Sequence, residues 1–199
     1  MSIDSIKKHY STVFITLVSI LLGITLGDLV SVFRTVEEPS MFTWLTLVYT
    51  VIIIMNAWVS YSMYAISVEL IPTPADAVNV FAITAAHFGL NAFIGKPPHL
   101  FFYAIAVYCL ISFCTVYFMV WRATQDKTKN YTVKPYYKAL TVNIIGAIVA
   151  LGFGYVSKHE IFSSTIENLI FSSGFSLPVI WVILFWRTWR MQINNTASR

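Results

Sequence analysis

The chain has 199 residues, of which 57% are hydrophobic and only 11% are charged, and its mean hydropathy is +0.71. A soluble domain carries roughly 25% charged residues, and a chain of this size could not bury so much apolar surface away from water. This composition excludes a soluble globular domain, and it equally excludes a disordered, collagenous or disulfide-stapled chain. It predicts an all-α integral membrane protein with a single transmembrane domain over residues 1–199 and no separate soluble domain.

Six stretches of the sequence are long enough and free enough of charge to cross a membrane. The shortest gaps between charged residues in these stretches, such as the gap from Lys8 to Asp28, hold 19 residues, and a transmembrane helix needs about 20 mostly apolar residues. Because lipid cannot satisfy the backbone, each stretch is predicted to be helical. The predicted spans are 12–33, 41–66, 76–95, 98–121, 137–156 and 163–187.

The first span, 12–33, follows two lysines but is too long for a cleaved signal peptide, so we expect an uncleaved helix. Asp28 is the acidic residue that lies deepest within any predicted span. A carboxylate inside a membrane is costly and often marks a functional site. At this shallow depth the alternative is a carboxylate that reaches the interface or pairs with Arg34 or Lys96.

The second span, 41–66, carries Asn56, which predicts either an interhelical hydrogen bond or a ligand-binding group. The next helix is predicted to begin after Thr73, with Pro74 at its first position and Asp76 as the acidic partner in a capping box.

The third span, 76–95, places four polar residues on one helical face: Asp76, Thr84, His87 and Asn91. The opposite face and its flank are apolar, with Val78, Phe81, Ala85, Phe88 and Ala92. Histidine titrates near neutral pH, so a mid-membrane imidazole predicts proton relay or pH gating. The alternative is a neutral His87 that is hydrogen-bonded to a neighbouring helix.

The connection after the fourth span, 122–136, is the longest polar and basic stretch. Lys127, Lys129 and Lys134 form a candidate surface there for a cytoplasmic protein partner or for anionic lipid. Asn143 in the fifth span is a further candidate polar-path residue. In the sixth span, Pro178 removes a backbone hydrogen bond and is a candidate hinge.

Two stripes of small residues predict places where helices approach closely. Gly23 and Gly27 form a GxxxG pattern in the first span, and Gly146 and Gly154 lie two turns apart in the fifth. We expect helix contacts at both stripes, within one chain or between subunits.

The distribution of Lys and Arg predicts the orientation. With both termini in the cytoplasm, 10 of the 13 Lys and Arg residues lie inside and only Arg34, Lys96 and Lys158 lie outside, which follows the positive-inside rule. We therefore expect a multi-pass protein with cytoplasmic termini, and the short loops favour a bacterial inner membrane. Since the basic residues lie beside membrane ends, no nucleic-acid partner is expected.

The sequence lacks the motifs of common active and metal sites, namely CxxC, HExxH, a Gly-rich phosphate loop and a nucleophile elbow. We therefore predict a protein that is not an enzyme and that holds no cofactor and no metal.

The leading hypothesis is a channel or transporter for an ion, a proton or a small solute, whose polar path is lined by Asp28, His87, Asn91, Asn56 and Asn143. One chain of 22.6 kDa is thin for a pore, so we expect a homo-oligomer in the lipid bilayer. The alternative hypothesis is an anchor, sensor or assembly subunit that transports nothing and docks a cytoplasmic partner through its basic inner surface.

Overall fold

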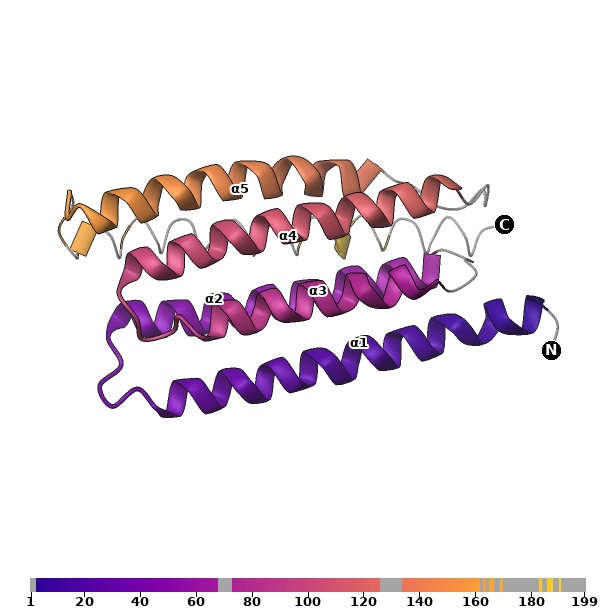
Figure 1. The fold of residues 1–199 in the computed structure, drawn as a ribbon, viewed down its shortest axis with the longest axis horizontal. Coiled ribbons are helices and arrows are strands. Elements are labelled where there is room, and N and C mark those ends of the chain that lie inside the picture. The colour runs from indigo at the N-terminus through magenta and orange to yellow at the C-terminus, as the bar shows by residue number, and fades with distance from the viewer. Residues whose placement is uncertain are drawn as a thin grey trace.

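The computed structural model describes residues 3–67, 73–125 and 134–161, together with single residues farther along the chain. It is helical over these ranges, with α1 (Ile3–Arg34), α2 (Met41–Ser67), α3 (Pro74–Asn91), α4 (Pro98–Gln125) and α5 (Lys134–Lys158). Consecutive helices run in opposite directions, as an up-and-down bundle (Figure 1). We call the end at which α1, α3 and α5 begin the Asp76 end, and the opposite end the Asp28 end.

Within the described residues, four helices contain stretches that are long and apolar enough to cross a membrane: Thr12–Arg34, Met41–Ala65, Pro98–Thr124 and Tyr136–Lys158. Their ends agree within about three residues with the spans predicted from the charge-free windows, which is the usual precision of boundaries predicted from sequence. The chain is therefore a multi-pass α-helical membrane protein.

The helix of the third predicted span, 76–95, ends four residues earlier than the sequence predicted. The α3 helix has only 18 residues and is not among the four apolar stretches, because polar residues interrupt it. It stops at Asn91, where the chain turns toward Gly95, whose φ is +74°. A Cβ at Gly95 would lie 2.7 Å from Cγ2 of Val36, so this turn requires a glycine.

The sixth predicted span, 163–187, lies almost entirely outside the described residues, and so does the candidate hinge Pro178.

The α3 helix lies within the bundle and contacts three other helices. It packs against α4 and α1, and more lightly against α2, while α1 also packs against α2. The α5 helix packs mainly against α4, on the side away from α1 (Figure 1). One apolar core runs between the helices, with Phe14, Leu22, Ile54, Leu90 and Phe101 among its buried members.

The outward faces of the helices carry large apolar side chains. Val78 and Ile148 are 65% and 64% exposed, and many others share this position: Val13, Ile20, Ile24, Phe81, Val107, Leu110, Ile145 and Leu151. An apolar surface of this extent would be a liability in water. It matches the hydrocarbon interior of a membrane, where apolar side chains face lipid.

Candidate functional site: a buried polar face on α3

The polar residues of α3 lie together on its buried face. Asp76, Thr84, His87 and Asn91 are buried, whereas the apolar residues of the opposite face are exposed: Val78, Phe81, Ala85, Phe88 and Ala92. This confirms the shared face that the sequence predicted. At 1.5 Å per residue the face extends about 22 Å from Asp76 to Asn91. We call these four residues the α3 polar face.

The Asp28 end of this face joins α3 to α1. The side-chain amide of Asn91 donates to Oδ2 of Asp28 at 2.8 Å and to the backbone carbonyl of Thr25 at 3.0 Å. Asn91 is fully buried, and its Oδ1 has no hydrogen-bond partner among the described residues. The carboxylate of Asp28 therefore meets a neutral amide, in place of the Arg34 or Lys96 that the alternative interpretation expected.

His87 lies in the middle of the bundle and is fully buried. Its ring lies 5.1 Å from the ring of Tyr108 on α4, between centroids, at an interplanar angle of 59°. It also lies near the carbonyls of Ile53 on α2 and Ile83 on α3, yet neither ring nitrogen completes a hydrogen bond within the described residues. A buried imidazole without partners is costly in a protein interior.

Further polar groups link α3 to α2 and α4 between His87 and Asp76. The hydroxyl of Tyr61 on α2 donates to the carbonyl of Asn79 at 3.2 Å, and the Asn79 amide reaches the carbonyl of Thr115 on α4 at 3.4 Å. Asn56 lies on α2 one turn beyond Ile53, and its Oδ1 is buried with no hydrogen-bond partner in the described ranges. Polar groups are thus present at several levels along the interior.

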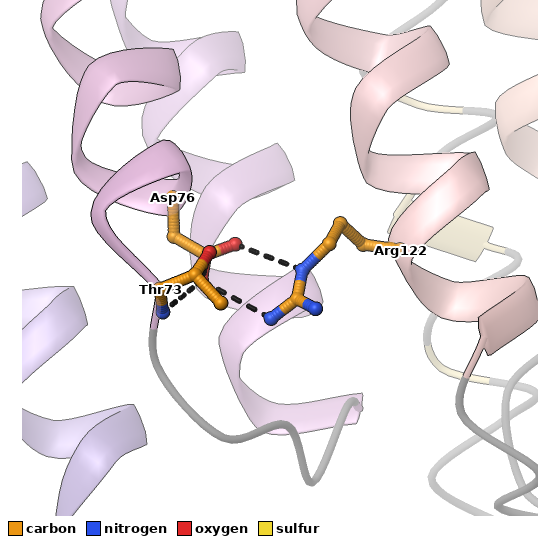
Figure 2. A network of polar contacts seen from close by, with 3 residues as sticks. All are labelled: Thr73, Asp76 and Arg122. Carbon is orange, nitrogen blue, oxygen red and sulfur yellow. Dashed lines mark hydrogen bonds and ion pairs between the residues drawn. The ribbon is translucent and has the colours of Figure 1, made fainter.

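The Asp76 end is built around the start of α3 (Figure 2). The predicted N-cap is confirmed: the backbone N–H of Thr73 donates to Oδ2 of Asp76 at 2.8 Å, and the Thr73 hydroxyl donates to the same oxygen at 2.9 Å. Asp76 also pairs with Arg122 near the end of α4, with Nε 3.4 Å from Oδ1 and a terminal guanidinium nitrogen 3.3 Å from Oδ2.

Two tyrosines lie beside this ion pair. The phenols of Tyr10 on α1 and Tyr64 on α2 interact electrostatically with both Asp76 and Arg122. Both hydroxyl groups are buried and neither completes a hydrogen bond within the described part of the chain, although that of Tyr10 lies close enough to the Asp76 carboxylate to interact with it as a donor. Burial and the neighbouring Asp76 carboxylate raise the pKa of Tyr10, which precedes the first membrane span, above its ordinary value. Tyr10 therefore stays protonated and keeps a proton to donate.

The structure brings together some of the predicted polar-path residues and leaves one apart. Asp28 and Asn91 are in contact, and His87 lies one turn from Asn91 on the same face. Asn143 belongs to α5, which packs mainly against α4, so it is not part of this group.

The predicted small-residue stripes differ in their surroundings. A Cβ at Gly154 would lie 2.5 Å from Cε1 of Tyr103, and one at Gly146 would lie 3.2 Å from Sγ of Cys109, so these glycines sit directly against α4. At Gly23 and Gly27 a Cβ would meet nothing within 4 Å among the described residues. Their contact with another subunit stays a prediction.

The candidate docking surface of Lys127, Lys129 and Lys134 lies mostly outside the described residues. Lys127 and Lys129 lie outside the described residues, and Lys134 is described only as the first residue of α5. Docking of a partner or of anionic lipid there stays a prediction.

Sequence reasoning missed Arg122, Tyr10 and Tyr64 as members of a polar group. Each of the three lies near one end of a helix, where basic and aromatic residues ordinarily anchor a span at the membrane interface. Of this group the sequence indicated only Asp76, because its capping-box position places it at the start of a helix. Its distant partner on α4 could not be read from spacing along the chain.

Comparisons with family models, curated proteins and solved structures find no match to this chain. Among the described residues no group of three His, Cys, Asp or Glu side chains is placed to hold a metal ion. The α3 polar face and its two charged ends are the feature from which a function can be argued.

Proposed function

We propose that this protein conducts protons across a membrane along the α3 polar face. The observation that carries the proposal is the buried His87, whose ring lies near the carbonyls of Ile53 and Ile83 but whose two nitrogens complete no hydrogen bond within the described ranges. A neutral imidazole has one donor and one acceptor nitrogen, so it can take a proton on one side and release another on the other.

The neighbours of His87 support this role. The same face of α3 reaches a carboxylate toward each end of the bundle, at Asp28 through Asn91 and at Asp76 directly. Ionisable groups within membrane proteins are costly and ordinarily belong to proton or ion pathways. If these polar residues only held the helices together, we would expect each buried donor and acceptor to have a hydrogen-bond partner.

Packing favours protons over solutes. His87, Asn91 and Thr25 are fully buried, so this region offers no open passage for a hydrated ion or solute. A proton needs only a chain of hydrogen bonds, which a few water molecules could complete. The longest step, from Asp76 to His87, covers about 16 Å along α3, and Asn79 and Tyr61 lie within it.

The proposal includes a bundle of six transmembrane helices, with α3 as the third span and residues 163–187 as the sixth. A helix as polar as α3 can cross a membrane only where other helices cover its polar groups, and burial of the α3 polar face supports this. In this proposal the Asp76 end and both termini lie in the cytoplasm, because this orientation puts most Lys and Arg residues inside. Because the proposed path lies within one chain, it does not require the predicted homo-oligomer.

Proton flux into liposomes tests the proposal. Purified protein is reconstituted with a pH-sensitive dye inside the vesicles, and a potassium diffusion potential drives protons inward. We expect flux above protein-free vesicles, and we expect His87→Ala and Asp28→Asn to lower it by about tenfold, which corresponds to about 1.4 kcal/mol. Phe88→Ala is the matched control, because Phe88 lies next to His87 on the exposed side of α3.

Protein vesicles that leak no more than empty ones would overturn the proposal. So would wild-type flux in both His87→Ala and Asp28→Asn.

A further inference from the structure

The Asp76 carboxylate accepts hydrogen bonds from two residues, Thr73 and Arg122, and the two sets of contacts differ in length. The Thr73 donors lie 2.8 and 2.9 Å from Asp76, whereas the Arg122 nitrogens lie 3.3 and 3.4 Å away. A close charge-assisted bond between guanidinium and carboxylate measures about 2.7–2.9 Å. Thr73 thus fixes the carboxylate to the start of α3 through the shorter contacts, and the contacts between Arg122 and the carboxylate are the longer ones (Figure 2).

Accessibility differs between the two partners as well. The side chain of Arg122 is 14% exposed and that of Asp76 is 4% exposed. Arg122 is therefore the more solvent-exposed member of the ion pair. Val80, one turn farther into the bundle on α3, is fully buried as well.

A second set of donors is present for the carboxylate if Arg122 leaves. Tyr10 and Tyr64 lie beside Asp76, and neither hydroxyl completes a hydrogen bond within the described residues, although that of Tyr10 already lies close enough to the Asp76 carboxylate to interact with it as a donor. Each could turn its O–H to Asp76 and replace a bond that Arg122 had supplied. Such replacement lowers the cost of opening the ion pair, which would otherwise leave a buried charge without a partner.

We propose that Asp76 is the residue through which the α3 polar face exchanges protons with water, and that Arg122 is the latch that closes this end. The inference rests on the proposed proton path and adds its exchange group and its closing contact. When the latch opens, water reaches the Asp76 carboxylate. A proton then passes from water to Asp76 and onward into the bundle, or in the reverse direction.

Two substitutions of the same ion pair separate this role from a structural one. Arg122→Gln removes the latch and keeps the exchange group, so we expect proton flux to rise about tenfold, as for loss of a charge-assisted bond. Asp76→Asn keeps an oxygen for Thr73 but cannot exchange a proton, so we expect flux to fall by a similar factor. Arg122→Lys is the matched control that retains the positive charge. A purely structural ion pair would move both variants in the same direction.

Chemical labelling tests the latch without any proton measurement. In full-length protein carrying Cys109→Ala and Cys114→Ala, a cysteine is placed by Val80→Cys and treated with a charged, membrane-impermeant thiol reagent. We expect slow labelling with Arg122 present and about tenfold faster labelling with Arg122→Gln. Ala75→Cys, at the exposed start of α3, should be labelled equally in both backgrounds.

The two measurements distinguish the possible failures. Equal labelling of Val80→Cys in both backgrounds would overturn the latch. Wild-type flux in Asp76→Asn, with flux still lost in His87→Ala, would overturn the exchange role and leave the proposed function standing. A wild-type protein that conducts no protons would overturn the proposed function and the exchange role together, while labelling would still decide the latch.

Discussion

The α3 and α5 helices join the bundle by opposite means. The α3 helix turns its polar residues inward, where Asp76 pairs with Arg122 and Asn91 contacts Asp28. The α5 helix instead turns small residues toward α4 and large apolar residues outward. Lipid provides no hydrophobic force between helices, so helices associate through close packing or through polar contacts. The two helices are examples of these two solutions, and the polar one brings a carboxylate and an imidazole into the interior of the bundle.

Removal of Arg122 should have the largest effect on stability. Arg122→Leu leaves the Asp76 carboxylate without a positive charge, which the neutral donors of Thr73, Tyr10 and Tyr64 do not replace, and we expect a loss of about 3 kcal/mol in the free energy of unfolding. Unfolding by SDS titration in mixed micelles measures the change. The double variant with Asp76→Leu should recover part of the loss, because no unpaired charge remains. A cost below about 1 kcal/mol would place the pair among ordinary surface ion pairs.

A charge on the outer face of α5 should prevent stable insertion. Ile148 lies near the middle of this helix and is 64% exposed, so in water Ile148→Arg would be nearly neutral. In a membrane an Arg at the helix centre costs about 2.5–3.5 kcal/mol, and we expect a matching drop in the inserted fraction in a microsome insertion assay. Tyr155→Arg, nearer the helix end, should cost less, because Arg can reach the interface there. Equal insertion of wild type and Ile148→Arg would contradict the assignment of α5 as a span.

Contact between α5 and α4 should be sensitive to one added methyl group. Gly154→Ala places a Cβ against the ring of Tyr103, and such overpacking costs about 1–3 kcal/mol. Gly152→Ala is the matched control, since nothing lies within 4 Å of its Cβ position among the described residues. That variant should gain up to about 1 kcal/mol from helix propensity. The same unfolding titration should therefore give opposite signs for two glycines only two residues apart.

Loss of Asn91 should have the smallest effect on stability. Asn91→Ala removes the contacts to Asp28 and Thr25, and interhelical hydrogen bonds in membrane proteins contribute about 0.6 to 1.7 kcal/mol. Asp28 is only half-buried, so water can replace part of what the amide supplied. A double-mutant cycle with Asp28→Asn measures the coupling between the two side chains. If Asn91→Ala lowered the free energy of unfolding as much as Arg122→Leu, the neutral contact of Asn91 would stabilise the protein as strongly as the charged contact of Asp76, contrary to our expectation.

Much of the fold could be predicted because the membrane imposes simple rules on length and charge. Four spans followed from charge-free windows, and the buried face of α3 followed from helical spacing. The end of α3 was not predictable from apolarity, because the residues after Asn91 remain apolar up to Gly95. The positive φ of Gly95 and its contact with Val36 end the helix there.

The sequence indicated several residues of the candidate site but not the contacts between them. Asp28, His87 and Asn91 were singled out because polar groups inside a span are costly. The contact of Asp28 with Asn91 joins residues 63 positions apart, and no local pattern encodes such a distance. The spacing of Gly23 and Gly27 predicted a helix contact, but nothing lies within 4 Å of a Cβ at either position among the described residues. Spacing along one helix does not show which face another helix covers.

The sequence by itself determined a multi-pass helical membrane protein, the face that α3 buries, and the cap at its start. These properties depend on composition, helical period and neighbours within one turn. Only the tertiary structure decided that Asp76 pairs with Arg122, that Asp28 meets a neutral amide, and that His87 lies among groups that leave its nitrogens unsatisfied within the described residues. Partners on different helices are set by how the helices pack, and packing sums over many side chains that no single stretch of sequence contains.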